Sequence, residues 1–317
     1  MTTFGDGLYQ FGGVPVDTPD YAGWFGTNTY FVDGDNGSDD NDGKMGTPFV
    51  TIQAGIDAAG PQDTVYIRGL APDADASEPG TYEEDLTIPY ANHGMKLIGV
   101  SSNYGVWGGP KIKNATAVAM LTVNASNVLI KNLQFNCTRN SGTYGIYLSG
   151  VSGYATEAGS VGAVIQNCMI KNASATYGGI YVDGGYGTVV RDCVFYNAVR
   201  GVWLASGGEG GLPSNQHRII NCDFTTNNGA SIANHVYIWG FVRDFVVRDC
   251  TFGLSTNPIN CTSDGSTGII FNCGFNNGDT TMTAASAGDI IIVADNDEIG
   301  VSACWAGDGT PIATSGS

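Results

Sequence analysis

The chain has 317 residues, with 30 acidic and 13 basic side chains and a formal net charge of −17. Such a surface repels phosphate and anionic lipid, so we expect no nucleic-acid partner and no membrane insertion. A polyanionic substrate is also disfavoured unless bound cations or local basic patches reverse the field. Hydrophobic residues make up 42% of the sequence, which is enough to bury a core and excludes disorder over most of the length.

The first 27 residues are rich in Gly and aromatic side chains and are too short to form a core. They contain no basic stretch followed by an apolar one, so the sequence predicts no signal peptide and synthesis in a cytoplasm. We interpret residues 1–27 as an arm that docks on another chain. A strap along the chain's own body is the alternative.

Residues 33–43 carry many side-chain oxygens, the ligands that calcium prefers. The segment lacks the bidentate Glu and the ligand spacing of an EF-hand. We therefore interpret it as a solvated turn, with a calcium site as the alternative. The three His have no metal-ligand spacing, and we assign no metal and no cofactor to the chain.

Residues 48–59 predict a short capping helix that covers one end of the fold. Thr47 suits the N-cap, Pro48 the first helical position, and Gly60 the C-terminal stop. Its apolar face would lie over a first coil formed by residues 64–67 and 86–88. That face consists of Phe49, Ile52, Ile56 and Ala59.

One pattern recurs from residue 128 onward: two or three long apolar residues, Asn or Asp, Cys (Leu in the first copy), a variable residue, then Phe or Ile. The Leu or Cys steps by 35, 25, 29, 28 and 23 residues, which indicates a constant coil with inserted loops. Between copies lies a second apolar strand, at 145–148, 179–182, 201–204 and 235–238. The predicted fold class is all-β: a right-handed parallel β-helix, or solenoid, of about nine or ten coils.

Alternation of side chains along each strand predicts what faces the core. The repeated Cys and the residue two positions later point inward, so we expect free, buried thiols and no disulfides. The residue before each Cys lies in the bend between sheets, where a short amide can bond the backbone of a neighbouring coil. The inward column is Cys168, Cys193, Cys222, Cys250 and Cys273, and the bend residues include Asn132, Asn167, Asn221 and Asn272.

A family resemblance supports this fold. The order Tyr30-Phe31-Val32-Asp33, Thr47-Pro48-Phe49, Thr51-Ile52-Gln53 and Asp63-Thr64-Val65-Tyr66-Ile67 resembles the N-terminal region of pectin-lyase-like β-helix proteins. Together with the coils, the resemblance covers residues 28–295 and leaves 296–317 as a C-terminal tail or cap. That superfamily includes lyases, hydrolases, epimerases and non-catalytic spikes, so the resemblance implies the fold and leaves the activity open.

The outward positions of the second strand form an aromatic stripe: Tyr147, Tyr181, Trp203, Tyr237 and, two residues on, Trp239. Such a stripe is unusual on a solvated surface. We expect it to be a contact with identical subunits about a threefold axis, because interface cores are enriched in aromatic side chains. Glycan binding is the alternative, and cover by the chain's own loops is a third.

Relatives in the superfamily imply catalysis by Asp residues with calcium and a basic residue, or by several Asp near the central coils. The residues available here are Asp183, Asp192, Asp223, Asp244 and Asp249, with Glu157, Glu209 and His217 in loops. Asp192 and Asp249 occupy the bend position of the repeat, and no Asp pair recurs beside a basic residue. We therefore assign no catalytic residue.

Residues 1–27 resemble the leading segments of phage virion proteins. With the fold, this implies a non-enzymatic structural component of a phage particle: a β-helical capsid decoration protein, spike or fibre. We expect a homotrimer that joins other virion proteins through residues 1–27 and resides in the virion after synthesis in the host cytoplasm. The alternative is a polysaccharide lyase or glycoside hydrolase that acts on a host-surface glycan.

Overall fold

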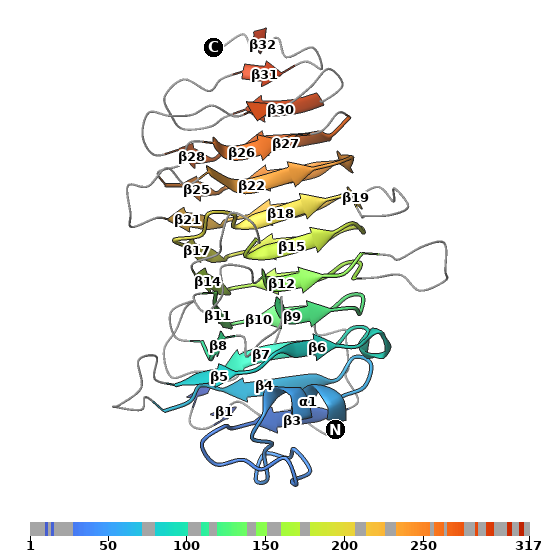
Figure 1. Ribbon diagram of the computed structural model, residues 1–317, viewed down its shortest axis with the longest axis vertical. Coiled ribbons are helices and arrows are strands. Elements are labelled where there is room, and N and C mark those ends of the chain that lie inside the picture. The colour runs from blue at the N-terminus through green and yellow to red at the C-terminus, as the bar shows by residue number, and fades with distance from the viewer. Residues whose placement is uncertain are drawn as a thin grey trace, which may run out of the picture.

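The computed structural model describes residues 10–11, 14–15, 28–71, 80–100, 109–113, 119–137, 144–150, 160–171, 178–206, 214–225, 233–253, 257–262, 265–275, 283–284, 290–294, 303–305 and 311–313. Within these residues the chain forms a rod of stacked strands, with a single α-helix at one end (Figure 1). Three long sheets run along the rod, so each complete coil contributes three strands. The predicted all-β parallel helix is confirmed.

Sheet A has twelve strands, of which the first ten pair in parallel and the last two in antiparallel fashion. Ten parallel strands agree with the nine or ten coils that the repeat predicts. In spatial order sheet A contains β3 (Thr29–Val32), β4 (Thr64–Arg68), β7 (Lys96–Val100), β10 (Leu129–Lys131), β13 (Val164–Gln166), β16 (Val189–Arg191), β20 (Arg218–Ile220), β24 (Phe245–Arg248), β27 (Thr267–Phe271), β30 (Ile290–Ala294), β31 (Ala303–Trp305) and β32 (Pro311–Ala313).

Sheets B and C have eight strands each. Sheet B contains β5 (Thr81–Glu83), β8 (Lys111–Lys113), β11 (Gln134–Asn136), β14 (Met169–Lys171), β17 (Val194–Tyr196), β21 (Asp223–Thr225), β25 (Thr251–Phe252) and β28 (Gly274–Phe275). Sheet C contains β6 (Leu86–Ile88), β9 (Ala119–Val123), β12 (Tyr144–Leu148), β15 (Ile180–Asp183), β18 (Val202–Ala205), β22 (Ala233–Trp239), β26 (Asn257–Cys261) and β29 (Thr283–Ala284). Two short strands, β19 (Ser214–Asn215) and β23 (Val242–Arg243), pair in parallel beside the long sheets.

From β10 to β27, the bend between sheets A and B is made by one left-handed residue in each coil. The φ angles are 60° at Asn132, 51° at Asn167 and 57° at Asp192, a region that Asn and Asp tolerate better than other side-chain-bearing residues. The next three coils continue this column with the bend residues Asn221, Asp249 and Asn272. This left-handed turn separates the apolar pair from the Cys-x-Phe segment, which is why each repeat yields two strands of different sheets.

The bend side chains form a ladder, with a difference from the expected backbone contacts. Asn132 Nδ2 does donate to a backbone carbonyl, that of Gly99, at 3.3 Å. Asn167 Nδ2 instead donates to Asn132 Oδ1 in the preceding coil at 2.7 Å. Asn221 and Asn272 donate in the same way to the carboxylates of Asp192 and Asp249, at 2.8 Å and 2.6 Å. In these coils the side chain of the neighbouring bend residue replaces the backbone carbonyl as acceptor.

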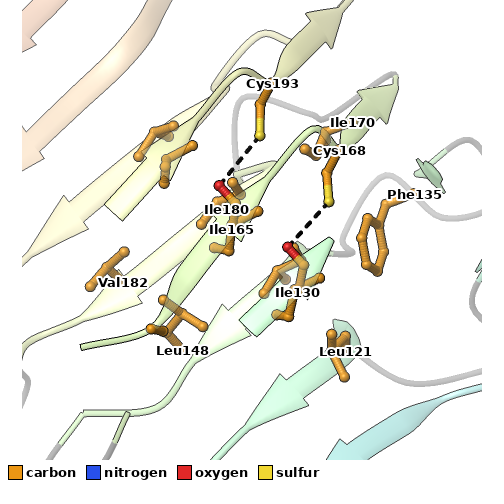
Figure 2. Packing of buried hydrophobic residues seen from close by; sticks show 14 of the residues in the cluster. Leu121, Ile130, Phe135, Leu148, Ile165, Cys168, Ile170, Ile180, Val182 and Cys193 are labelled. Atoms are coloured by element: carbon orange, nitrogen blue, oxygen red, sulfur yellow. Dashed lines mark hydrogen bonds between the residues drawn. The ribbon is translucent and has the colours of Figure 1, made fainter. Parts of the chain in front are cut away.

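The core consists of the inward columns that alternation predicts. Seven of the eight Cys lie in the part of the chain for which burial is described, and all seven are free and buried. Figure 2 shows that the Cys168 thiol donates to the Ile130 carbonyl at 3.7 Å and the Cys193 thiol to the Ile165 carbonyl at 3.6 Å. The Phe column stacks ring on ring, with centroid distances of 4.6, 4.9 and 5.0 Å along Phe195, Phe224, Phe252 and Phe275.

The capping helix is shorter than predicted. Helix α1 spans Ile52–Ala58, and its N-cap is Thr51, whose side chain accepts a hydrogen bond from Ala54 N at 3.2 Å. Phe49 is excluded from the helix because its backbone pairs with β3: Phe49 N donates to Phe31 O at 2.9 Å. The predicted apolar face is nevertheless buried, and α1 packs against β3, β4 and β6. Across the described ranges, no helix has the length and apolar character needed to cross a bilayer.

The predicted N-terminal arm, residues 1–27, lies outside the described residues except for two short strands. These strands, β1 (Gln10–Phe11) and β2 (Val14–Pro15), pair in antiparallel fashion. At the other end, the predicted tail or cap at 296–317 contributes β31 and β32, which extend sheet A beyond its last parallel strand (Figure 1).

The bend ladder leads to a stability prediction at Asn167. Asn167→Gly removes the amide bond but suits a φ of 51°, whereas Asn167→Ala also places a Cβ in the left-handed region. We expect the free energy of unfolding to fall by about 1 kcal/mol for the Gly variant and about 2 kcal/mol for the Ala variant. Urea denaturation followed by circular dichroism measures both. Equal losses would contradict a conformational role for this residue.

Candidate functional site

The predicted aromatic stripe is present on the outward face of sheet C. Tyr147 pairs with Tyr181, Tyr181 with Trp203, and Trp203 with Tyr237 in parallel register over four neighbouring strands. Their strand neighbours are buried in the core, including Ile146, Ile180, Val202 and Val236. The inward and outward assignments of these strands are therefore correct.

The rings of the stripe stack on one another along the rod. Their centroids are 5.5 Å apart for Tyr147 and Tyr181, 4.7 Å for Tyr181 and Trp203, and 5.4 Å for Trp203 and Tyr237. Tyr144 adds a further ring, 4.8 Å from Tyr181 at an interplanar angle of 13°. The tyrosine faces therefore cover one another and leave mainly their edges and hydroxyls toward solvent.

Asp183 accepts hydrogen bonds from two tyrosine hydroxyls at one edge of the stripe. Tyr147 Oη donates to its Oδ2 at 2.9 Å, and Tyr181 Oη donates to its Oδ1 at 3.4 Å. Burial, together with this neighbouring carboxylate, raises the pKa of both tyrosines. Both hydroxyls therefore remain protonated donors, and they hold Asp183 against the sheet.

Arg200 covers the stripe from the opposite edge. Its guanidinium lies 4.6 Å from the ring centroid of Trp203 and 4.1 Å from that of Tyr237. Burial lowers the pKa of Arg200. Both Arg200 Nε and Trp203 Nε1 are buried without a hydrogen-bond partner. A cation is thus held by aromatic faces rather than by a carboxylate.

The stripe ends in an exposed aromatic patch. Trp239 is 45% exposed and Phe241 54% exposed, and the Trp239 ring lies 6.5 Å from that of Trp203. A third large ring, Tyr186, is 38% exposed in the same region. The backbone of Tyr186 pairs with Asn215, and Asn215 pairs with Arg243, which lies two residues after Phe241. This patch is the part of the site that is most open to a partner.

The candidate carboxylates lie on two sides of the rod, with Asp183 apart from Asp192, Asp223 and Asp249. Asp192 and Asp249 occupy the bend between sheets A and B, with Asn221 between them in the same column. Asp223 lies on sheet B and accepts from Thr251, Asp244 pairs with Thr267 beside β24, and Asp183 lies on sheet C. Glu157 and Glu209 lie outside the described residues. Each described candidate is held by a structural hydrogen bond.

His217 lies in the core rather than in an open loop. Its Nε2 is 2.6 Å from Ser214 Oγ, and the two side chains are 1% and 0% exposed. A Ser–His pair of this kind is enclosed by the fold, so it has no access to a substrate. Its role is to satisfy a buried hydroxyl.

The acidic loop at 33–43 is ordered by its own carboxylates. Asp39 accepts from Val50 N at 3.0 Å, Thr51 N at 3.0 Å and Thr51 Oγ1 at 2.8 Å, and Asp33 pairs with Arg68. In the part of the chain that the structure describes, no group of three or more His, Cys, Asp or Glu is arranged to hold a metal ion.

Sequence reasoning missed Arg200 and Tyr144 as members of the site. Each directly precedes the Gly that opens a second strand, in the segments Tyr144-Gly145-Ile146 and Arg200-Gly201-Val202. Strict alternation gives this position the inward parity of Ile146 and Val202, two residues on, so the pattern carried no signal for an outward side chain. The equivalent residue of the intervening coil, Gly178, has no side chain, so the position also does not repeat.

Comparison with known proteins agrees with this architecture. The family profile described as right handed beta helix region matches residues 90–213. A pectin methylesterase from Aspergillus niger superposes with a TM-score of 0.55 at 13% identity, covering 90% of this chain and 87% of that one. The chain has the right-handed β-helix fold.

Two further structures share this fold. A rhamnogalacturonan lyase has a TM-score of 0.53 at 14% identity, covering 78% of this chain and 68% of that one. A pectate lyase from Xanthomonas campestris has a TM-score of 0.50 at 14% identity, covering 79% and 78%. No curated protein sequence matches the chain significantly. At these identities the likeness establishes the fold alone.

The buried His lead to a pH prediction. Burial lowers the pKa of His217 to about 4 and that of His235 to about 4, from an ordinary value of 6.5. Between these values the unfolded chain binds protons that the folded rod does not, so the free energy of unfolding decreases as the pH falls through this window. The loss by pH 4 should be on the order of 3 kcal/mol for each His.

Urea denaturation between pH 7.5 and pH 4 measures this loss. His217→Gln removes one of the two titrating groups and should flatten the dependence on pH. The exposed His93 is the matched control, and His93→Gln should leave the dependence unchanged. An unaltered slope in the His217 variant would show that this His does not account for acid destabilisation.

Proposed function

We propose that this chain is a non-enzymatic structural component of a phage particle. It is a β-helical decoration protein, spike or fibre that assembles as a homotrimer through the aromatic stripe. The observation that carries the proposal is the exposed patch that continues the stripe, Trp239 at 45% and Phe241 at 54% exposure. Aromatic rings are enriched in interface cores, and apolar patches on a protein surface commonly mark contacts with partners.

The ring geometry favours a subunit contact over a sugar platform. A sugar ring stacks on a free aromatic face, but Tyr144, Tyr147 and Tyr181 turn their faces to one another at 4.8–5.8 Å. Trp203 is covered on one side by Arg200. A protein partner can pack against the edges and hydroxyls that remain, because protein interfaces combine apolar packing with a polar rim.

The placement of the carboxylates supports a non-enzymatic role. Glycoside hydrolysis uses two carboxyl groups about 5–9.5 Å apart on opposite sides of the scissile bond. Asp183 lies on sheet C, apart from Asp192 and Asp223, which lie at and just after the bend between sheets A and B. Each of the three is engaged in a structural hydrogen bond, and this engagement supports the non-enzymatic role.

A polysaccharide lyase or glycoside hydrolase acting on a surface glycan is the second candidate. It is favoured by the extent of the stripe, which runs over four neighbouring strands. An extended saccharide could lie along a surface of that length. The titles of the similar structures name pectin methylesterase, rhamnogalacturonan lyase and pectate lyase.

Replacing Trp239 separates the two candidates. Because this ring is 45% exposed, Trp239→Ala should leave the rod folded. In a trimer it removes an interface anchor, and we expect the association to weaken by about 2 kcal/mol, roughly thirtyfold in dissociation constant. Sedimentation velocity over a range of concentrations measures the change.

Tyr90→Ala is the matched control, because Tyr90 is 42% exposed and lies beyond β6, five strands away from β22 in sheet C. This variant should associate as the unaltered chain does. If Trp239→Ala keeps its mass but loses retention on a glycan array, the second candidate replaces the first.

Deletion of residues 1–27 tests the attachment arm. The parallel coils begin at β3, Thr29–Val32, so the truncated chain should retain its fold and its melting temperature. We expect it to be absent from purified particles when it is expressed in place of the full chain. Normal incorporation of the truncated chain would show that the arm is not the anchor.

A further inference from the structure

Arg200 is a cation without an anionic partner. In the described part of the chain its guanidinium contacts only the faces of Trp203 and Tyr237, and its Nε has no acceptor. Removing a charge from water is costly unless other groups compensate it, and buried polar groups without partners call for an explanation. Among the described residues the guanidinium is therefore compensated by aromatic faces alone, a kind of contact that a further aromatic ring can extend.

The exposed patch lies at the same height on the rod as Arg200. Arg200 immediately precedes Gly201, whose N–H bonds to the carbonyl of His235 on β22, and the guanidinium itself lies over Tyr237 on the same strand. Trp239 is the last residue of β22, and Phe241 follows it. The backbone of Arg200 therefore lies at one edge of the outward face of sheet C, and Trp239 with Phe241 lies at the other. Within one chain the Arg200 guanidinium and the Trp239 ring both reach Trp203, at 4.6 Å and 6.5 Å from its ring centroid.

We propose that in the homotrimer Arg200 of one copy packs against Trp239 of the neighbouring copy. The guanidinium is then held between its own Trp203–Tyr237 pair and the neighbour's indole. Around a threefold axis, the first edge of sheet C in each copy meets the second edge in the next, so three equivalent contacts close the ring. This inference rests on the trimer of the proposed function and identifies the residues that join its copies.

The charge distribution along the chain favours contact between copies at the middle coils of the rod. Residues 1–85 contain sixteen acidic and two basic side chains, and residues 250–317 contain seven acidic and none basic. Residues 86–249 contain seven acidic and eleven basic side chains. Parallel copies therefore repel one another strongly at both ends of the rod and least in the middle coils, which carry Arg200 and Trp239.

A double-mutant cycle on the full-length chain tests the pair. Its four members are the unaltered chain, Arg200→Met, Trp239→Leu and the double variant, and sedimentation velocity gives the trimer dissociation constant of each. We expect each single change to weaken association about tenfold, and the double change to add less than about threefold, because both remove one contact. The free energies of unfolding of the same four chains report any coupling through the shared Trp203 ring within one chain, and we expect these to be additive. Arg218→Met is the matched control, since Arg218 is an exposed residue of sheet A, and its effect should be small and independent of Trp239→Leu.

Several outcomes decide against the pair. A hundredfold weakening of association in the double variant is the product of two independent effects and would overturn the Arg200–Trp239 contact. An unaltered association constant in Arg200→Met would also overturn it. Because Arg200 also packs within its own chain, Arg200→Lys serves as a second variant: it keeps the charge, and we expect a smaller loss than for Met. A loss as large as that of Met in a folded Lys variant would contradict a contact that depends on the cation.

The proposed function has a separate failure. If the unaltered chain is a monomer at all concentrations, both the trimer and the pair are excluded. If a stable trimer forms but the cycle is additive, the trimer stands and the pair alone is excluded. Loss of glycan retention in Arg200→Met, at unchanged mass, would assign Arg200 to saccharide binding and overturn the pair.

Discussion

The register of the coils from β10 to β27 depends on the left-handed bend residue that turns the chain from sheet A to sheet B. Its amide or carboxylate bonds to the bend residue of an adjacent coil, as Asn167 does to Asn132 and Asn221 to Asp192. The bend thereby fixes the register of these coils at one point. A slip of one residue would exchange the inward and outward faces of each strand, so this constraint also defines the core.

Because the register between coils is constant, a residue that recurs once per coil forms a column along the rod. A Phe that recurs once per coil becomes a continuous ring stack inside the rod, and a Tyr or Trp at the outward position becomes one outside it. The outer column is polar at both edges, because Asp183 bonds to tyrosine hydroxyls at one edge and Arg200 lies over rings at the other. A face with an apolar centre and charged margins resembles the layout of a protein interface.

The repeat could be predicted from sequence because periodicity is a property of the chain itself. The Cys column, the Phe column and the outward stripe from Tyr147 to Tyr237 all follow from it. The start of α1 could not be predicted, since Phe49 is held in an extended conformation by β3, a partner far along the coil. Arg200 and Tyr144 also escaped, because their position does not repeat: the coil between them has Gly178 there. Side-chain contacts that do not recur need coordinates to be found.

The buried thiols can report which coils of the rod have separated. Cys168, Cys193, Cys222, Cys250 and Cys273 stand one to a coil, and each is enclosed only while the coils on either side remain stacked. Solenoids can fray from their ends, one unit at a time. A thiol reagent applied under mild stress would therefore label the coils in order of release, and mapping the labelled Cys would show from which end the rod unwinds.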